Sequence, residues 1–247
     1  MKKLRLMLVL VIMVTLGAPV QENVAHAKTF KNYDYELLGN GTVKITGYHG
    51  KAKKLTIPKI IKGMQVTEIG EFCFQDNNKI KTLVIPEGVQ KLEELSLYSM
   101  LELKDLTIPQ TITSMTDCGI GWYSEASDHP KMTFHVVKGS KAFKYVVKKH
   151  SNSKIKVAKK TKATVVFNAN GGYCNKRVKC VKKGAKLGKL PVPVSDEAVF
   201  LGWYTKKTGG KKITAKTKIK STKNVTYYAR WEALEEDEED VYIQNAE

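Results

Sequence analysis

The side chains best suited to chemistry in this 247-residue chain are four cysteines and five histidines. Cys174 and Cys180 are separated by five residues, which is close enough for a disulfide bond where the backbone permits it. No histidine or further cysteine stands beside this pair in a zinc-binding pattern. We therefore expect either a disulfide or two free thiols here, and neither a metal ion nor a cofactor.

The histidines form no catalytic pattern with their neighbours in the sequence. None pairs with a serine, cysteine or carboxylate, and the chain lacks a nucleophile elbow, a phosphate-binding loop and a His-x-x-His metal motif. Because these patterns mark many enzyme classes, their absence predicts that the protein is not an enzyme.

Basic residues are the other chemically distinctive set. The chain has 42 Lys+Arg and 24 Asp+Glu, and between Lys160 and Trp231 there are 18 basic residues but only Asp196 and Glu197 as acids. Because so few acids are interspersed, we expect this region to contact a polyanion, although a merely solvated surface would have the same composition. The candidate polyanion contacts are Lys176, Arg177, Lys179, Lys182, Lys183, Lys206, Lys207, Lys211 and Lys212.

An acidic run follows this basic region. After Trp231 there is no Lys or Arg, whereas eight acidic residues occur. Runs of like charge are usually solvated, so residues 232–247 are predicted to be a disordered tail. The alternative is an acidic segment that folds back on the basic region.

The first 27 residues have the pattern of an export signal. Lys2, Lys3 and Arg5 precede an apolar run from Leu6 to Leu16, and Ala25-His26-Ala27 offers small residues at the positions that a signal peptidase reads. We expect cleavage after Ala27 and a secreted or cell-envelope location. The apolar run is shorter than the roughly 20 residues that span a bilayer, so no transmembrane segment is expected after cleavage, and an uncleaved anchor is the alternative.

Export narrows the set of expected partners. Outside the cell, the polyanions met first are teichoic acids, acidic glycans and anionic lipids. The sequence contains no nucleic-acid-binding motif, so nucleic acid is not an expected partner.

A repeat of about 23 residues organises the chain between the signal and the basic region. The motif Leu-x-Ile-Pro occurs at residues 55–58, 83–86 and 106–109, and the positions 23 residues apart remain apolar well beyond the motif. Each unit should supply one short strand whose Leu and Ile face a shared core and whose Pro ends it. Five extra residues within 59–65 of the first unit are expected to form a loop.

Stacked units of this kind predict a short solenoid of about three coils. Cys73 and Cys118 lie two coils apart, beyond the range of a disulfide, and are expected to be buried thiols. The side chains that alternate outward beside the core positions form a candidate binding face, namely Lys54, Thr56, Thr82, Val84, Asp105 and Thr107.

Both ends of the solenoid have a predicted cap. Upstream, residues 33–38 and 42–46 alternate around Gly39-Asn40-Gly41 and predict a hairpin. Downstream, a strand at residues 133–137 precedes a helix from Lys141 to about Lys149 with Ser140 as its N-cap. The face expected to close the stack carries Phe143, Val146, Val147 and His150.

The repeat resembles the BspA-type (Treponema pallidum-type) leucine-rich repeats. The residues that carry the resemblance are Leu-x-Ile-Pro, Val-Thr-Glu-Ile-Gly at 66–70 and the aromatic Phe74, within about residues 30–157. The third unit departs from the family pattern at residues 117–122 and is degenerate. The resemblance implies an exported bacterial surface protein that attaches to host matrix or to other cells.

The basic region resembles the Listeria-Bacteroides repeat, the B-repeat of internalin-type proteins. The resemblance rests on Val-Val-Phe-Asn-Ala-Asn-Gly-Gly at 165–172, Gly-Trp-Tyr at 202–204 and Tyr-Tyr-Ala-Arg-Trp at 227–231. It implies a β-grasp-like fold in a cell-envelope setting. The aromatics of these motifs are expected to build a core rather than a carbohydrate platform.

The sequence therefore predicts a mainly β protein with some α structure, a leucine-rich-repeat solenoid followed by a small β-grasp-like domain. The expected divisions are a signal peptide at 1–27, the repeat domain with caps at 28–158, the B-repeat domain at 159–231 and the acidic tail at 232–247. The expected function is that of an adhesin-like interaction protein whose partner is a host or bacterial surface protein or glycan, with teichoic acid or another polyanion as a candidate. The alternative is a structural spacer or targeting accessory in an envelope assembly, without a ligand of its own.

Overall fold

One face of the solenoid is a parallel sheet made by the Leu-x-Ile-Pro motifs. The computed structural model describes residues 28–115, 117–121 and 131–234. In it the sheet has five strands, which are β4 (Lys54–Thr56), β7 (Thr82–Val84), β9 (Asp105–Thr107), β11 (Thr133–Val137) and β12 (Lys154–Ala158). Leu55, Leu83 and Leu106 lie in register and are buried. The motif thus places its leucine in the core and its neighbours outward, as strand alternation requires.

Each proline follows the last backbone hydrogen bond that its unit makes within this sheet. The backbone N–H of Ile57 donates to Val84 O, and that of Ile85 donates to Thr107 O, both at 3.0 Å. The next residue in each unit is Pro58 or Pro86, which has no N–H to offer. The expected role of proline as the strand terminator is therefore confirmed.

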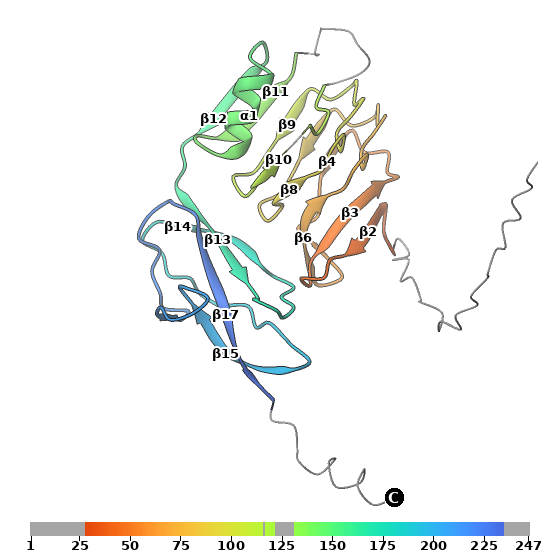
Figure 1. Cartoon of the computed structure of the whole chain (residues 1–247). Coiled ribbons are helices and arrows are strands. Elements are labelled where there is room, and N and C mark those ends of the chain that lie inside the picture. The colour runs from red at the N-terminus through yellow and green to blue at the C-terminus, as the bar shows by residue number, and fades with distance from the viewer. Residues whose placement is uncertain (1–27, 116, 122–130, 235–247) are drawn as a thin grey trace, which may run out of the picture.

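The opposite face is a second sheet, which the sequence did not predict as a separate set of strands. Its parallel members are β3 (Val43–Tyr48), β6 (Met64–Ile69), β8 (Lys91–Leu92) and β10 (Ser114–Met115). The expectation of one strand per unit was therefore wrong, because a complete coil must return across the core and becomes extended a second time. Figure 1 shows the two sheets enclosing the core of the solenoid.

The 23-residue register extends to the backbone itself. Phe72 and Leu95 have φ of 52° and 49°, and Asp76 and Ser99 have φ of 56° and 55°, so the same left-handed turns recur one unit apart. Because such angles are uncommon for residues other than glycine, their recurrence marks a shared turn geometry. Phe72 is therefore not a core residue, because this turn leaves its side chain 46% exposed.

The two predicted caps are present. The antiparallel strands β2 (Tyr33–Leu37) and β3 form the upstream hairpin, and β1 (Lys28–Phe30) pairs with β2. Helix α1 (Lys141–Lys149) begins after Ser140, whose Oγ accepts a hydrogen bond from Phe143 N at 3.0 Å.

The buried face of α1 differs from the predicted one. Val146 and His150 are buried as predicted, and Phe143 is partly buried against the core. Val147 is 46% exposed, and Ala142 is buried in its place. The helix packs against β11, β10 and β12.

The five-residue insertion of the first unit is a small hairpin rather than a plain loop. Strand β5 (Ile60–Ile61) pairs antiparallel with the start of β6, and Lys62 and Gly63 turn the chain with positive φ. This hairpin projects toward the second domain and supplies part of its contact surface.

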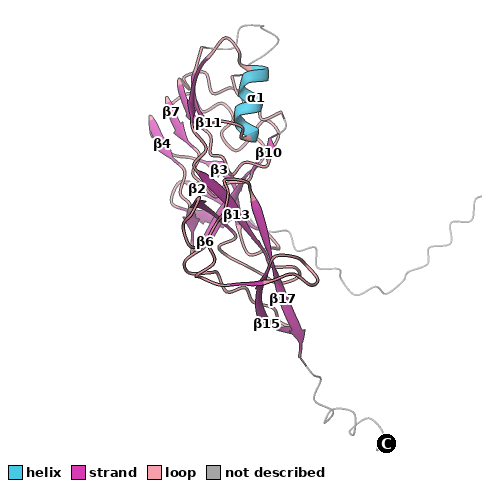
Figure 2. Ribbon diagram, turned by 90° about the vertical axis from the view of Figure 1, so that its left-hand side faces the viewer, coloured by secondary structure: helices cyan, strands magenta, loops and turns pink. Residues whose placement is uncertain are grey.

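The second domain is a mixed five-stranded sheet. Its strands are β13 (Lys162–Asn168), β14 (Val178–Lys182), β15 (Ala198–Tyr204), β16 (Lys212–Ile213) and β17 (Val225–Ala233), in the order β14-β13-β17-β15-β16. The first and last strands, β13 and β17, are parallel, and the other pairs are antiparallel. This arrangement is compatible with the β-grasp-like fold that the resemblance implies. In Figure 2, β15 and β17 of this sheet extend away from the solenoid.

Aromatic residues of the recognised motifs build the core of this domain. Trp203, Phe167 and Tyr227 are buried, and the ring centroids of Phe167 and Trp203 lie 5.0 Å apart. Trp203 Nε1 donates to Pro191 O at 2.8 Å, so its polar atom is satisfied. Tyr204 and Tyr228 lie on the opposite face of the sheet and are half-buried.

Candidate functional site

A hydrogen-bonded seam joins the solenoid to the second domain. The side-chain amide of Gln65 in β6 donates from Nε2 to Val178 O at 2.6 Å and accepts from Val178 N at 2.8 Å. Gln65 thus binds both backbone groups of one residue on the edge strand β14, as a neighbouring strand would. Gln65 and Val178 are buried, so these bonds are shielded from water.

The surroundings of Gln65 accommodate this pairing. Gly88 has φ of 120°, and a Cβ at this position would lie 2.8 Å from Gln65 Nε2. A side chain at residue 88 would therefore displace the amide from β14. The backbone adds a further bond at the same place, from Gln65 N to Asn175 O at 2.8 Å.

Three more contacts extend the seam along the solenoid. Gln110 Nε2 donates to Lys162 O at 3.2 Å and to Thr164 Oγ1 at 3.3 Å, and Cys174 N donates to Asn40 O at 2.9 Å. Lys162 and Glu87 form an ion pair at 3.1 Å, but both side chains are more than a third exposed, so this pair adds little stability. Coils one to three all contribute to the seam, which gives the second domain a defined orientation.

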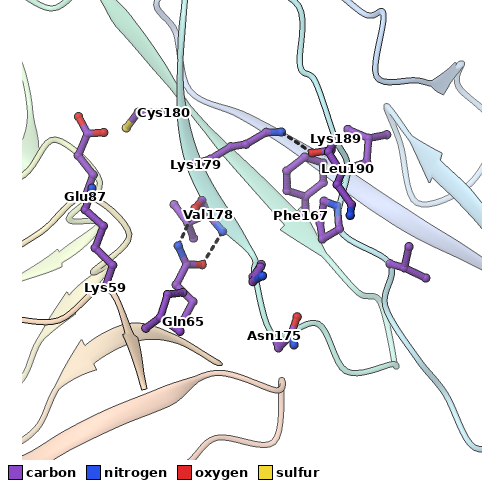
Figure 3. A pocket seen from close by; sticks show the side chains of 14 residues that line it. Lys59, Gln65, Glu87, Phe167, Asn175, Val178, Lys179, Cys180, Lys189 and Leu190 are labelled. Atoms are coloured by element: carbon purple, nitrogen blue, oxygen red, sulfur yellow. Dashed lines mark hydrogen bonds between the residues drawn. The ribbon is translucent and has the colours of Figure 1, made fainter. Parts of the chain in front are cut away.

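A cleft of about 710 Å³ lies along this seam (Figure 3). The solenoid lines it with Lys59, Ile60, Gln65 and Glu87, and the second domain contributes β14 together with the loop at residues 189–192. The cleft combines four lysines with an apolar wall that includes Val178, Leu190 and Val192. Sites between domains are common locations for ligands, and this lining suits an anionic group that carries an apolar portion.

One of the four lysines is already engaged by the protein. Lys179 Nζ donates to Leu187 O at 2.6 Å and to Lys189 O at 3.0 Å, and it lies 5.4 Å from the centroid of the Phe167 ring. Burial lowers the pKa of Lys179 below its ordinary value. Lys179 therefore braces the 187–189 loop, and the solvent-exposed lysines of the cleft are Lys59, Lys176 and Lys189.

The predicted polyanion contacts fall into three groups. Arg177 is half-buried, its Nε donates to Phe167 O at 3.4 Å, and burial lowers its pKa. Lys176 and Lys179 line the cleft. The remaining contacts are exposed, either at the end of β14 or in the hairpin between β15 and β16, and these are Lys182, Lys183, Lys206, Lys207, Lys211 and Lys212.

The candidate binding face of the solenoid is a continuous outer surface of the β4–β7–β9 sheet. Lys54, Thr82 and Asp105 occupy one row across the strands, and Thr56, Val84 and Thr107 occupy the next. All six side chains are exposed or half-buried. The rows continue onto β11, where His135 Nε2 lies 3.2 Å from Asp105 Oδ1.

The disulfide between Cys174 and Cys180 is not formed, and both residues are free thiols. Cys174 packs in the core of the second domain, whereas Cys180 Sγ faces the solenoid and accepts a hydrogen bond from Gln110 Nε2 at 3.5 Å. Burial raises the pKa of Cys180 to about 11. Cys73 and Cys118 are also free and buried, as expected, and burial raises the pKa of Cys118 to about 11.

Two of the features predicted from the sequence concern residues outside the described ranges, namely the export signal at 1–27 and the acidic run from 235 onward. Within the described ranges, no group of three or more His, Cys, Asp or Glu side chains is placed to hold a metal ion. No helix in the described part of the chain is long and apolar enough to cross a membrane.

Sequence reasoning missed Lys59, Lys189 and Gln65. The cleft exists only because two domains meet, and no local pattern in either domain indicates the contact. One usable signal was the insertion at 59–65, because an irregular unit in a regular repeat often marks a surface with its own role.

Comparison with protein families gives two matches. Residues 48–124 match the family described as BspA type Leucine rich repeat region (6 copies), and residues 164–230 match the Listeria-Bacteroides repeat domain. Neither description names an enzyme. Comparison with curated protein sequences gave no match.

Two solved structures are similar to parts of the chain. A leucine-rich repeat protein from Bacteroides capillosus is 19% identical, with a TM-score of 0.32, over 44% of this chain and 71% of that one. A leucine-rich cell surface protein from Faecalibacterium prausnitzii is 20% identical, with a TM-score of 0.33, over 60% of this chain. The match spans 39% of the Faecalibacterium protein's own length.

Proposed function

The chain is a BspA-type leucine-rich repeat protein with a Listeria-Bacteroides repeat domain after its solenoid, and from this we propose that it is an adhesin-like interaction protein of the bacterial cell surface or medium. In this proposal the solenoid face contacts a protein or glycan, and the second domain contacts a polyanionic surface. The first 27 residues direct export and are removed after Ala27.

The observation that carries the polyanion contact is the distribution of charge over the second domain. Seven of the nine predicted basic contacts are exposed, and only Asp196 and Glu197 provide acids between Lys160 and Trp231. A surface of one sign attracts polyanions over a distance and raises the rate at which they associate. If the basic surface is merely solvated, retention on a polyanion should depend only on the total charge of the chain and not on where the basic residues lie.

The test uses the chain from Lys28 to Glu247 on immobilised heparin and on immobilised teichoic acid. We expect retention at about 0.1 M salt and release well before about 0.5 M, because phosphate and sulfate contacts release counterions in proportion to their number. A variant with Lys206, Lys207, Lys211 and Lys212 changed to Gln should elute markedly earlier. The control changes Lys138, Lys141, Lys144 and Lys148 of the solenoid to Gln, which removes the same charge from the other domain.

Two results would contradict the proposal. Equal elution of both fourfold variants would mean that only total charge matters. Retention that does not change between about 0.1 and 0.5 M salt would mean that charge contacts do not hold the complex.

A structural spacer is the second candidate, and the seam is the observation that favours it, because a spacer needs a defined angle between its domains. A spacer would bind neither polymer, and its role would depend on its length. N-terminal sequencing of exported material tests the shared premise of both candidates, since an intact Met1 would contradict cleavage after Ala27.

A further inference from the structure

Arg230 is an exception to the composition of this chain. The chain has 39 lysines and three arginines, and only Arg177 and Arg230 follow the predicted signal peptide. Lysine supplies a point charge, whereas arginine supplies a planar fork of donors that matches an oxyanion. Arg177 uses its Nε on a backbone carbonyl, so its presence has a structural explanation. The hydrogen-bonding role of Arg230 needs a different explanation.

The guanidinium of Arg230 lies on the outer face of the second domain's sheet, against an aromatic ring. Its Cζ is 4.0 Å from the centroid of the Tyr204 ring, which corresponds to a stacked cation–π contact. Arg230 is on β17, and Tyr204 is two residues from the position on β15 that pairs with it. The tyrosine therefore holds the guanidinium close to the sheet instead of allowing it to extend into solvent.

Two of the three donor nitrogens of this guanidinium are unpaired. Nε and Nη2 of Arg230 are buried and have no hydrogen-bond partner among the described residues. Within those residues Arg230 also forms no ion pair, and Glu232, two residues further along the same face of β17, does not neutralise it. Buried donors without partners are rare and costly, so a pair of them on one charged side chain indicates a missing acceptor.

A second cation, Lys212, lies near the same site, over the position where Gly202 has no side chain. Gly202 pairs with Arg230 across β15 and β17, at a bulge where its φ is 136°. A Cβ on Gly202 would lie 2.5 Å from Lys212 Cε and 3.2 Å from Lys212 Nζ, so the lysine occupies the space that a side chain would fill. Lys212 is exposed, and its ammonium lies over Gly202, the residue that pairs with Arg230.

We propose that Arg230, Lys212 and Tyr204 form a specific oxyanion site that binds one sulfate or phosphate ester group of the polyanion. The arginine fork takes two oxygens of the group, Lys212 takes a third, and Tyr204 fixes the plane of the fork. This inference rests on the proposed function and deepens it. In this proposal Arg230 recognises the shape of the anionic group, whereas the surrounding lysines attract the group only by charge.

The first test observes the guanidinium directly, in the chain from Lys28 to Glu247. This chain contains two arginines, so the spectrum of ¹⁵Nε–H groups should contain two signals, assigned by the loss of one in Arg230→Lys. Titration with a heparin oligosaccharide, and separately with a glycerol phosphate oligomer, should shift the Arg230 signal and slow its exchange with water. The Arg177 signal, whose donor is already bonded to Phe167 O, should remain in place.

The second test separates geometry from charge. Arg230→Lys keeps the charge but removes the fork, so affinity should fall about tenfold while the salt dependence stays unchanged. Lys206→Gln removes one of the exposed predicted contact charges, so it should reduce the salt dependence with only a small loss of affinity. The fluorescence of the buried Trp203 reports whether each variant retains its fold.

The two titrations distinguish the ester type. If the Arg230 signal shifts only with the heparin oligosaccharide, the site binds sulfate esters, and if it shifts only with the glycerol phosphate oligomer, the site binds phosphate esters. Normal polymer binding with a stationary Arg230 signal, or normal affinity in Arg230→Lys, would overturn this site while leaving the proposed function intact. Absence of polymer binding by the wild-type chain in low salt would overturn both.

Discussion

Gln65 shows how a single polar residue can connect two domains. Its amide has one donor and one acceptor directed at Val178, and both partners are buried. Nothing in the sequence selects this glutamine, because it lies between apolar repeat positions and its partner is 113 residues away. A contact of this kind follows from how two finished domains pack, and it leaves no periodic pattern in either of them.

Replacing Gln65 by Ala should lower the free energy of unfolding by about 1–3 kcal/mol, because two buried backbone groups of Val178 lose their partners. Chemical denaturation followed by circular dichroism measures this change. Gln75→Ala is the matched control, since Gln75 is exposed, and it should alter stability by less than about 0.5 kcal/mol. Equal stability of both variants would show that water replaces the amide without cost.

The buried thiols make a prediction about alkaline pH. Burial raises the pKa of Cys118 and Cys180 to about 11, above the ordinary value of 9.0. Between these values the unfolded chain loses thiol protons that the folded chain keeps, so stability should be complete below pH 9 and should fall as the pH rises toward 11. Replacing both cysteines by Ala should reduce the slope of this part of the pH profile. Some slope should remain, because burial also raises the pKa of Cys73 and Cys174. Urea denaturation at several pH values measures the change.

At the scale of elements, prediction succeeded where a local rule repeats. The Leu-x-Ile-Pro strands, the upstream hairpin and helix α1 all follow from periodicity, turn residues or caps, and the structure contains each of them. It failed for β8 and β10, because two extended residues are too short for any pattern to indicate. The residues of the candidate face were predictable because side chains alternate along each repeated strand. The cleft was not predictable, because it lies between two domains.

The N-cap of α1 is the most direct element to test. Ser140→Ala removes the acceptor for Phe143 N and should destabilise the protein by about 1 kcal/mol. Lys144→Ala, at an exposed position of the same helix, should have almost no effect. Thermal unfolding of both variants makes the comparison, and equal midpoints would show that the helix is held by packing alone.

At the scale of the whole molecule, the insertion in the first repeat and the edge strand of the second domain's sheet together form the contact between the two domains. An exposed edge strand offers unpaired backbone groups to other chains, and Gln65 covers part of that edge on β14. The hairpin that contains Gln65 is the only irregularity in the repeat spacing of the first two units. We infer that the irregular unit orients the basic domain relative to the solenoid face.

The combined variant Gln65→Ala/Gln110→Ala tests this orientation. It removes the glutamine side-chain bonds from the seam while leaving both domain cores untouched. In the wild-type chain, ¹⁵N relaxation should give one rotational correlation time for both domains, because they tumble as a unit. In the variant the second domain should show a shorter correlation time than the larger solenoid. A single unchanged value would mean that the backbone bonds of Gln65 and Cys174 suffice to hold the two domains together.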